Sequence, residues 1–457
     1  MANKVLQEND FGTLSSFKNG NIVTKLSAIL FGLGNFCNKQ IGKGLAFLTI
    51  EVAYIYYMVT FGIGAIGDFI TLGTREQEEV FNEKLQIYEY VTGDNSMLCL
   101  LYGVVTLFVT VGFLIMMAES VKSAYFSQYL VAKGKSPATF FQDMKSLKND
   151  KLHVALLAVP MSGVILFTIV PLVFMIFIAF TNYDKEHLPP GNLFQWIGIE
   201  NFINILDMSG QIGSTFMPVL IWTFVWAVLA TVTNYFLGMI LALVINRKNT
   251  KWKAFWRFNF MLSIAIPSFV SLLTMRTLFS DNGAVNVLLR DLGVIGITES
   301  YPFWTDGTIA KVMIVLINIW IGVPFTMLNH TGILQNIPGE LYEAADVEGA
   351  GEVAKFFKIT LPYMLFITAP YLITTFIGNI NNFNVIYLLT GGAPNRLDYY
   401  YAGETDLLVT WLYKLTITEK DYKMGSVIGI MIFIISAVFS LITYRHTAAY
   451  KDEEGLQ

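Results

Sequence analysis

The stretch MPVLIWTFVWAVLATVTNYFLGMILALVI, residues 217–245, contains no Asp, Glu, Lys or Arg. A helix of about 20 apolar residues crosses a hydrocarbon core about 30 Å thick, so this stretch is long enough to span a membrane. Other stretches have the same character: 44–66, 97–117, 155–181, 258–280, 309–329, 363–390 and 424–444. The sequence therefore predicts an all-α polytopic membrane protein with about eight transmembrane helices.

The composition agrees with this class. Of the 457 residues, 54% are hydrophobic and 14% are charged, whereas soluble chains carry about 25% charge. The formal net charge of −4 gives no general attraction to nucleic acid, which we do not expect as a partner. No segment outside the predicted spans exceeds about 40 residues, fewer than the roughly 50 that an independent domain needs. We expect a membrane bundle without an appended catalytic domain.

Lysine and arginine collect on alternate connecting segments, which orients the chain by the positive-inside rule. The basic segments include 122–151, 247–257 and 355–358, whereas the segment 76–83 is acidic. With eight crossings, both termini and the 336–362 loop fall on the cytoplasmic side.

The N-terminal region, residues 1–150, is predicted to contain a cytoplasmic segment, a short interfacial helix within 26–37 and two accessory spans. Glu51 lies inside the first span, and intramembrane acids are functional candidates by default. Its place only a couple of turns into the helix favours a structural or interfacial role. Residues 151–446 are predicted to form a core of six spans, and 447–457 a cytoplasmic tail.

No catalytic constellation is apparent. The four histidines are far apart and lack cysteine or carboxylate partners at metal-ligand spacing. The phosphate-binding pattern G-x-x-x-x-G-K-[ST] and the nucleophile pattern G-x-S-x-G are both missing. We therefore expect no catalytic residue and no metal in this chain, which we interpret as a protein without enzymatic activity of its own.

The 336–362 loop has the pattern of two short helices joined by a tight turn. Pro338 suits the first turn of a helix, and Glu340 falls near its positive end. Gly349 and Gly351 then interrupt the pattern, and a second helix from Glu352 is expected to stop near Pro362. From composition alone, an ordinary amphipathic connector is favoured over a docking element.

The spacing in this loop resembles the EAA loop of binding-protein-dependent ABC importers. The matching residues are Glu343, Ala344, Ala345, Gly349, Leu361 and Pro362. In that family the loop couples the membrane helices to an ATPase. The resemblance therefore implies a type I ABC importer permease fold.

Within that family the chain resembles MalF-type permease subunits of maltose/maltodextrin importers, in the compact variant of Gram-positive bacteria. The resemblance runs from about Ala155 to Tyr444 and includes Asn381-Asn382-Phe383 and the segment 402–409. It implies a bacterial cell-membrane location, a MalG-like second permease subunit, two ATPase subunits that bind ATP and Mg, an extracellular sugar-binding protein and an oligosaccharide substrate. The loop 182–216 is too short for the folded domain that Gram-negative relatives carry there.

Several amides lie within the seventh predicted span, at Asn379, Asn381, Asn382 and Asn384. On one continuous helix Asn379 and Asn382 share a face. Hydrogen bonding between helices and a sugar site explain them equally well from the residues alone.

The resemblance to MalF-type permeases favours a sugar site over hydrogen bonding between helices as the explanation of these amides. Matched position by position, it places substrate contacts on Ser268, Asn318, Ile321, Gly322, Phe325, Thr375, Asn379 and Asn382. Ile264 and Gly378 stand where the family has tyrosine and phenylalanine, which suggests room for longer or differently shaped oligosaccharides. The remaining alternatives are an ABC permease for another oligosaccharide and a stand-alone secondary sugar transporter.

Overall fold

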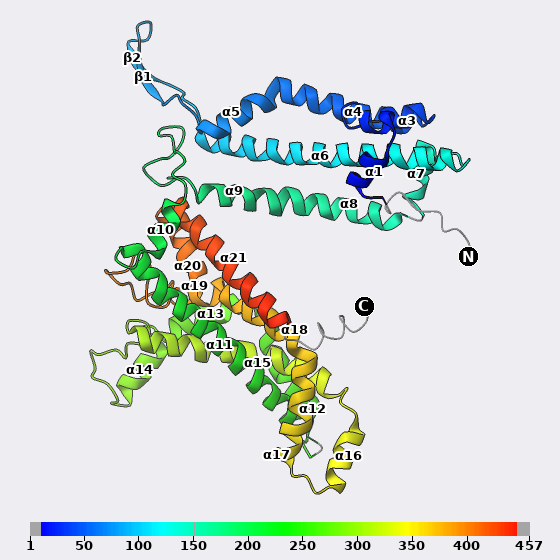
Figure 1. The fold of residues 1–457 in the computed structure, drawn as a ribbon. Coiled ribbons are helices and arrows are strands. Elements are labelled where there is room, and N and C mark those ends of the chain that lie inside the picture. The colour runs from blue at the N-terminus through cyan, green and yellow to red at the C-terminus, as the bar shows by residue number, and fades with distance from the viewer. Residues whose placement is uncertain (1–10, 150, 248, 446–457) are drawn as a thin grey trace. The chain divides into compact units, whose positions relative to one another are not determined.

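The computed structural model describes residues 11–149, 151–247 and 249–445, and the predicted tail 447–457 and residues 1–10 lie outside it (Figure 1). Within the described residues, seven helices are long and apolar enough to cross a membrane, or eight if one bent pair counts as a span. The predicted helical membrane class is confirmed. One element was not anticipated, a two-stranded antiparallel hairpin of β1 (Glu78–Asn82) and β2 (Ile87–Val91).

The chain forms two compact units, residues 1–197 and 198–457. The helices of the first unit are α1 (Thr13–Asn19), α2 (Ile22–Leu26), α3 (Leu33–Cys37), α4 (Ile41–Tyr57), α5 (Ile63–Thr71), α6 (Ser96–Ala132), α7 (Phe140–Ser146), α8 (Leu152–Val164) and α9 (Val170–Ile178). π-Helical turns join α4 to α5 and α8 to α9, so each pair makes one long rod. Both rods pack on α6, and the third predicted span therefore belongs with this unit by its contacts (Figure 1).

Short N-terminal helices are fastened to α6 through buried polar groups. The backbone N–H of Gly32 donates to Ser120 Oγ at 2.9 Å, and Asn35 Nδ2 donates to Ser123 Oγ at 2.9 Å. Glu51 is buried and accepts a hydrogen bond from the Phe31 N–H at 2.8 Å. Glu51 therefore stabilises this corner of the fold, in agreement with the structural role favoured above.

The segment 26–37 is not a single helix. It contains the end of α2, a turn and α3, with Gly32 in the left-handed region at φ +77°. A Cβ on Gly32 would lie 2.6 Å from the Gly44 carbonyl oxygen, so glycine is required where the turn meets α4. The location of this segment at the membrane interface remains a prediction.

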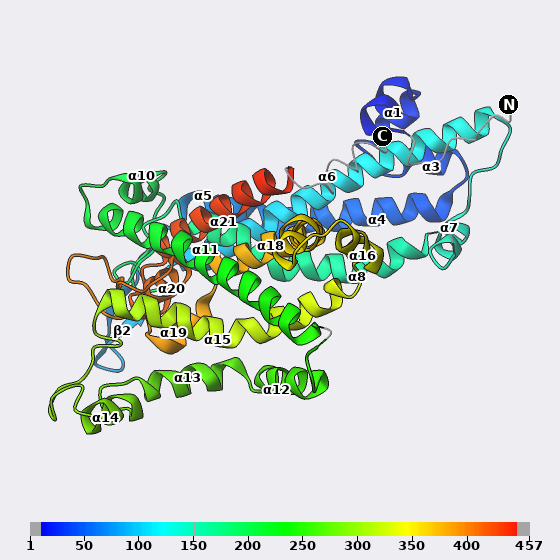
Figure 2. The ribbon, with the colours of Figure 1, turned by 90° about the horizontal axis from the view of Figure 1, so that it is seen from below.

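The second unit contains the remaining helices. They are α10 (Glu200–Leu206), α11 (Gln211–Asn246), α12 (Lys253–Ala265), α13 (Ser268–Leu278), α14 (Ala284–Asp291), α15 (Gly307–Leu334), α16 (Gly339–Val347), α17 (Glu352–Lys355), α18 (Leu361–Ile380), α19 (Phe383–Leu389), α20 (Leu408–Tyr413) and α21 (Tyr422–Arg445). α11 contacts both α15 and α18, and α21 packs on α18 and α20 (Figure 2).

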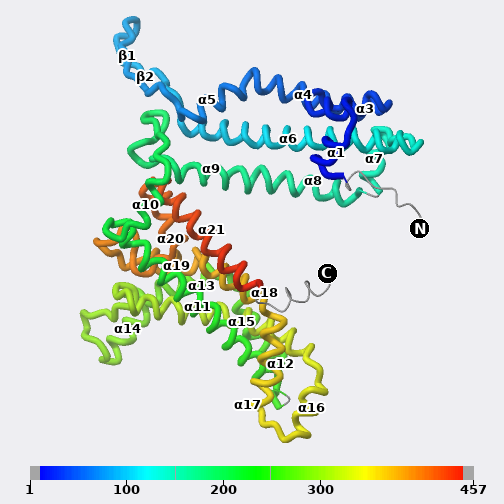
Figure 3. The backbone as a smooth tube through the Cα atoms, in the orientation of Figure 1, coloured from blue at the N-terminus to red at the C-terminus, as the bar shows by residue number. Residues whose placement is uncertain are grey.

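The fifth predicted span, 258–280, is wrong as a continuous helix. The chain bends by 85° between α12 and α13, where Ile266 and Pro267 are extended. Proline has no backbone N–H and disfavours helical geometry in the residue before it, which accounts for the break at this position. The smooth trace in Figure 3 lets the reader follow this chain path.

The predicted functional core, residues 151–446, does not coincide with the second unit, which begins at residue 198. The difference comes from the α8–α9 rod, whose contacts are with α6. Its side chains are apolar and largely exposed, as with Val159 and Phe167. A rod of this kind suits lipid contact. The division at residue 150 remains a prediction about function.

Close approach of α11 and α15 depends on glycine. A Cβ on Gly238 would lie 2.7 Å from Thr326 Cβ. Lipid offers little hydrophobic drive for helices to associate, so small residues at the crossing supply the packing.

We expect Gly238→Ala to lower the stability of the purified protein by about 1–3 kcal/mol, as overpacked cores do. Thermal unfolding in detergent measures the effect. Gly332→Ala on α15 is the matched control, because a Cβ there would meet no heavy atom of the described chain within 4 Å. Equal melting temperatures for the two variants would show that the crossing tolerates the extra methyl group.

Candidate functional site

The loop between α15 and α18 carries the predicted ATPase-coupling residues. α16 begins directly after Pro338, has Glu340 in its first turn and ends before Glu348, as the sequence predicts. Glu343 and Ala344 are exposed, Ala345 is half-buried, and Val347 at the end of α16 is 89% exposed. The helix thus exposes acidic side chains together with small and apolar ones.

Gly349 makes the turn after α16. Its φ of +75° lies in the left-handed region, which a side chain disfavours, although a Cβ here would have no heavy atom of the described residues within 4 Å. Gly351 has an ordinary φ of −71° and equally open surroundings. The two glycines therefore differ in backbone requirement and not in space.

The second helix does not stop near Pro362, and this part of the prediction is wrong. A π-helical turn, Phe356–Thr360, joins α17 to α18 without a break, and Leu361 and Pro362 form the first turn of α18. The π-helical turn accommodates Pro362, which has no N–H to donate, while the Leu361 N–H donates to the Phe356 carbonyl. The Tyr342 hydroxyl lies 2.8 Å from Thr360 Oγ1 and ties α16 to this rod. The loop is thus connected rigidly to a long membrane helix.

At the far end of α18 the helix breaks between Asn381 and Asn382, so the argument from one continuous helical face is wrong there. Asn382 Oδ1 accepts from the Val385 N–H at 3.2 Å and caps α19. Asn382 Nδ2 still reaches Asn379 Oδ1, at 3.5 Å. The two amides therefore meet, and they do so through the break.

Asn379 also bonds to α11. Its Nδ2 donates to Thr231 Oγ1 at 3.0 Å, and its backbone carbonyl accepts from Trp226 Nε1 at 3.1 Å. These are contacts between helices, as the packing explanation expects. They also leave Asn379 and Asn382 with capacity for further hydrogen bonds, because each amide offers two donors and two lone pairs.

Asn318 on α15 has an unpaired group. The side chain is buried, yet its Nδ2 has no hydrogen-bond partner within the described part of the chain. Leaving such a donor unpaired costs on the order of 1–3 kcal/mol. An amide that needs an acceptor here is suited to a ligand hydroxyl.

The other predicted contacts are more dispersed. Ile321 packs on the hydrophobic core between α11, α15 and α19, and Thr375 is half-buried on α18. Ser268 at the start of α13 and Phe325 on α15 are exposed. Their helices pack pairwise, α13 on α15 and α19 and α15 on α18 and α19, so the predicted residues lie on adjoining elements.

Gly322 has a packing role. A Cβ on Gly322 would lie 2.5 Å from Asn234 Nδ2 on α11, so this glycine lets the Asn234 amide approach α15. Sequence reasoning missed Asn234 and Thr231, which lie one helical turn apart on α11. Asn234 is the only amide side chain in the predicted span 217–245, and this is the signal that could have identified it.

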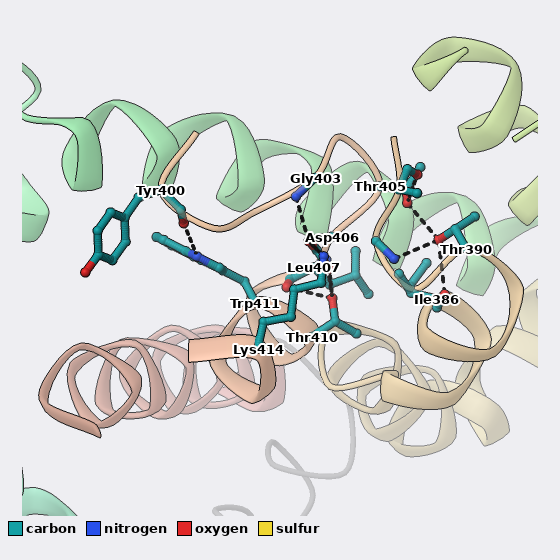
Figure 4. A network of polar contacts seen from close by, with 12 residues as sticks. Ile386, Thr390, Tyr400, Gly403, Thr405, Asp406, Leu407, Thr410, Trp411 and Lys414 are labelled. Atoms are coloured by element: carbon teal, nitrogen blue, oxygen red, sulfur yellow. Dashed lines mark hydrogen bonds and ion pairs between the residues drawn. The ribbon is translucent and has the colours of Figure 1, made fainter. Parts of the chain in front are cut away.

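A second polar network fills the segment between α19 and α20 (Figure 4). Asp406 is fully buried and accepts from the Gly403 N–H at 2.7 Å, the Thr410 hydroxyl at 2.9 Å and Lys414 Nζ at 2.6 Å. Burial raises the pKa of the Asp406 carboxyl, while Lys414 and the hydrogen bonds oppose that rise. Nearby, the Thr390 and Thr405 hydroxyls lie 2.8 Å apart. The network holds this segment in one conformation.

The chain resembles known transport proteins over nearly its whole length. It is 34% identical to the "Maltodextrin transport system permease protein MdxF" of Bacillus subtilis (strain 168), covering 94% of this chain and 96% of that protein. It is also 34% identical to the "Galactooligosaccharides transport system permease protein GanP" of the same organism, covering 94% and 99%. With the "Maltose/maltodextrin transport system permease protein MalF" of Klebsiella aerogenes it shares 36% identity over 58% of this chain and 52% of that protein.

The fold of the chain also resembles that of a solved structure. A chain in the "Crystal structure of a bacterial ABC transporter involved in the import of the acidic polysaccharide alginate" superposes with a TM-score of 0.53 and 22% identity, covering 66% of this chain and 96% of that one. Residues 234–450 match the family described as "Binding-protein-dependent transport system inner membrane component". This match includes the α16 loop, the Asn379–Asn382 junction and the Asp406 network. The chain therefore belongs to the permeases of binding-protein-dependent transport systems.

Proposed function

We propose that this chain forms half of the translocation pathway of an ATP-driven oligosaccharide importer, with maltodextrins as the substrate class. The observation that carries the proposal is the continuous rod from α17 to α18, which connects an exposed α16 to the amides of Asn379 and Asn382. A motion applied at α16 would reach the polar cluster through this rod. The names of the relatives at 32–36% identity support the substrate class.

The partners follow from this arrangement. α16 would dock on one of two ATPase subunits, which bind ATP and Mg and carry out the hydrolysis, so this chain is not itself an enzyme. A MalG-like second permease would complete the pathway, and an extracellular sugar-binding protein would deliver the oligosaccharide. Exposed apolar side chains around the loop, at Val347, Val353 and Phe357, are suited to such docking.

Galacto-oligosaccharides are a second candidate substrate class, because the identity to the galactooligosaccharide permease equals that to the maltodextrin permease. Both classes are neutral chains of hydroxyl-rich rings, and amides such as Asn318 suit either. A stand-alone secondary transporter would leave α16 and its glycine turn without a role.

Purification of the tagged chain with its partners tests the proposal. We expect an ATPase to co-purify and the reconstituted complex to accumulate labelled maltodextrin only with ATP and the binding protein. Uptake of galacto-oligosaccharide without uptake of maltodextrin would identify galacto-oligosaccharides as the substrate class. Uphill transport by this chain without nucleotide would contradict the proposal.

The orientation of the chain has its own test. We propose that α16 and both termini are cytoplasmic, as the basic segments indicate. Glu343→Cys in a background without Cys37 and Cys99 is expected to react with a membrane-impermeant maleimide only after cells are opened. Labelling of intact cells at this position would overturn the orientation.

Gly349→Ala is expected to reduce coupled transport at least several-fold while the complex still assembles. Alanine in the left-handed region is strained by about 1 kcal/mol or more, which would shift the turn that aims α16. Gly351→Ala is the matched control, because its φ is ordinary and its surroundings are open. The ratio of sugar transported to ATP hydrolysed measures coupling, and equal ratios for both variants would make the loop a simple connector.

Asn379→Ala is expected to weaken uptake roughly 5- to 10-fold, the loss of about one net hydrogen bond to the sugar. Thr231→Val removes the partner of Asn379 on α11 and keeps the side-chain shape, so it reports on helix packing alone. Asn381→Ala is the control, since its exposed amide bonds to the Ile377 carbonyl of its own helix.

Uptake and the yield of assembled complex are measured for all three variants. If Thr231→Val and Asn379→Ala lower the yield equally and uptake per complex is unchanged, Asn379 serves packing and not the substrate.

A further inference from the structure

A cavity of about 540 Å³ lies beside the Asp406 network, in the second unit. The 395–402 segment forms one wall, and the start of α11 and the turn after α20 form the others. Its volume falls within the range of about 300–1,000 Å³ that is usual for small-molecule sites. The α17–α18 rod and then α19 lie between α16 and this segment, so the cavity lies at the end of the second unit opposite to α16 (Figure 1).

Three consecutive tyrosines line the cavity, Tyr399, Tyr400 and Tyr401. Tyr401 has a φ of +52°, in the left-handed region that aromatic residues rarely adopt. Its side chain is 43% exposed and its ring lies 4.7 Å from that of Tyr400. A large aromatic side chain is therefore held in an unfavourable backbone conformation and is still partly open to solvent. Such positions are concentrated at binding sites.

The walls are rigid. Trp411 Nε1 donates to the Tyr400 carbonyl at 2.7 Å, the Tyr400 N–H donates to Thr215 Oγ1 at 2.7 Å, and the Tyr400 hydroxyl donates to Asp421 at 2.6 Å. Because three separate elements hold Tyr400, the cavity exists before any ligand arrives. A preformed site loses little conformational entropy on binding.

Both basic residues on the walls are paired within the protein, whereas the Glu419 carboxylate, which also lines the cavity, has no ion-pair partner among the described residues. Arg396 pairs with Asp398 at 2.6 Å and stacks on the Tyr399 ring at 4.6 Å, and Lys414 pairs with Asp406. Gln211 and Asn395 add neutral amides. A site that has aromatic faces, amides, paired cations and one carboxylate favours a neutral ligand with many hydroxyl groups over an anion. Pyranose rings have this character, with apolar C–H faces for the tyrosines and hydroxyl edges for the polar groups.

We propose that this cavity is an outer subsite that holds the distal units of a long oligosaccharide while its leading units occupy the polar cluster around Asn379. The inference rests on the proposed function and extends it, since it assigns chain-length preference to a part of the protein outside the membrane-spanning helices. Only an oligosaccharide that extends beyond the units held at the polar cluster would use this cavity. Gly378, where a Cβ would meet no heavy atom of the described residues within 4 Å, leaves open space near the polar cluster for a longer chain.

Tyr401→Ala and Tyr399→Ala test the subsite in the reconstituted complex, with a disaccharide and a heptasaccharide of the series that the wild type transports. We expect the uptake rate of the heptasaccharide to fall about 3- to 10-fold, as for the loss of one aromatic contact. Disaccharide uptake should change less than about twofold, within the spread of surface substitutions. Tyr301→Ala is the matched control, because Tyr301 is 42% exposed and does not line the cavity.

A second variant distinguishes loss of the subsite from misfolding of the protein. Gln211→Trp places a bulky side chain at the exposed start of α11, narrows the cavity and leaves its buried walls intact, so the same selective loss for the heptasaccharide is expected. An equal loss for both sugars would overturn the subsite and assign the surface to docking of the binding protein. Unchanged uptake of both sugars would also overturn it while leaving the proposed function in place. Absence of any oligosaccharide uptake by the wild type would instead remove the proposed function and the subsite together.

Discussion

The need to pair every backbone N–H and C=O in a medium without water determines where the helices of the second unit can break. In the hydrocarbon region each N–H and C=O needs a partner inside the protein, so spanning segments are helices and every break must be satisfied locally. Asn382 meets this need between α18 and α19 by capping the second helix with its own side chain. At Ile266-Pro267 a proline, which has no N–H to satisfy, makes the other break. The two breaks occur at the starts of α13 and α19, helices that pack on each other.

The same constraint explains how α16 is connected to the polar groups at the far end of α18. The π-helical turn Phe356–Thr360 keeps the helix continuous from α17 into α18, where a proline could otherwise have ended it. Tyr342 joins α16 to that rod through Thr360. The glycine turn at Gly349 is then the main place where the direction of α16 can be set, because the segments on either side of it are helical.

Polar groups serve two kinds of purpose in this chain. In the first unit, Glu51, Ser120 and Ser123 are buried and accept hydrogen bonds that hold the short helices and turns in place. In the second unit, Asn318 is buried without a partner for its amide nitrogen among the described residues. The first pattern is that of a structural core, and the second leaves hydrogen-bonding capacity for a substrate.

The sequence by itself determined the class of protein, the approximate spans and the resemblance of the 336–362 loop to its family, because long apolar runs and the spacing from Glu343 to Pro362 are local signals. It did not determine the break in span five, the path through Pro362 or the exit of Asn382 from the α18 helix, because proline and asparagine each fit several backbone conformations. Only tertiary packing brought Thr231 to Asn379 and Asn234 to Gly322, and assembled the tyrosine-lined cavity. Residues 211, 399–401 and 414 are far apart or irregular in sequence, and no periodic pattern predicts that a folded loop will bring them around one space.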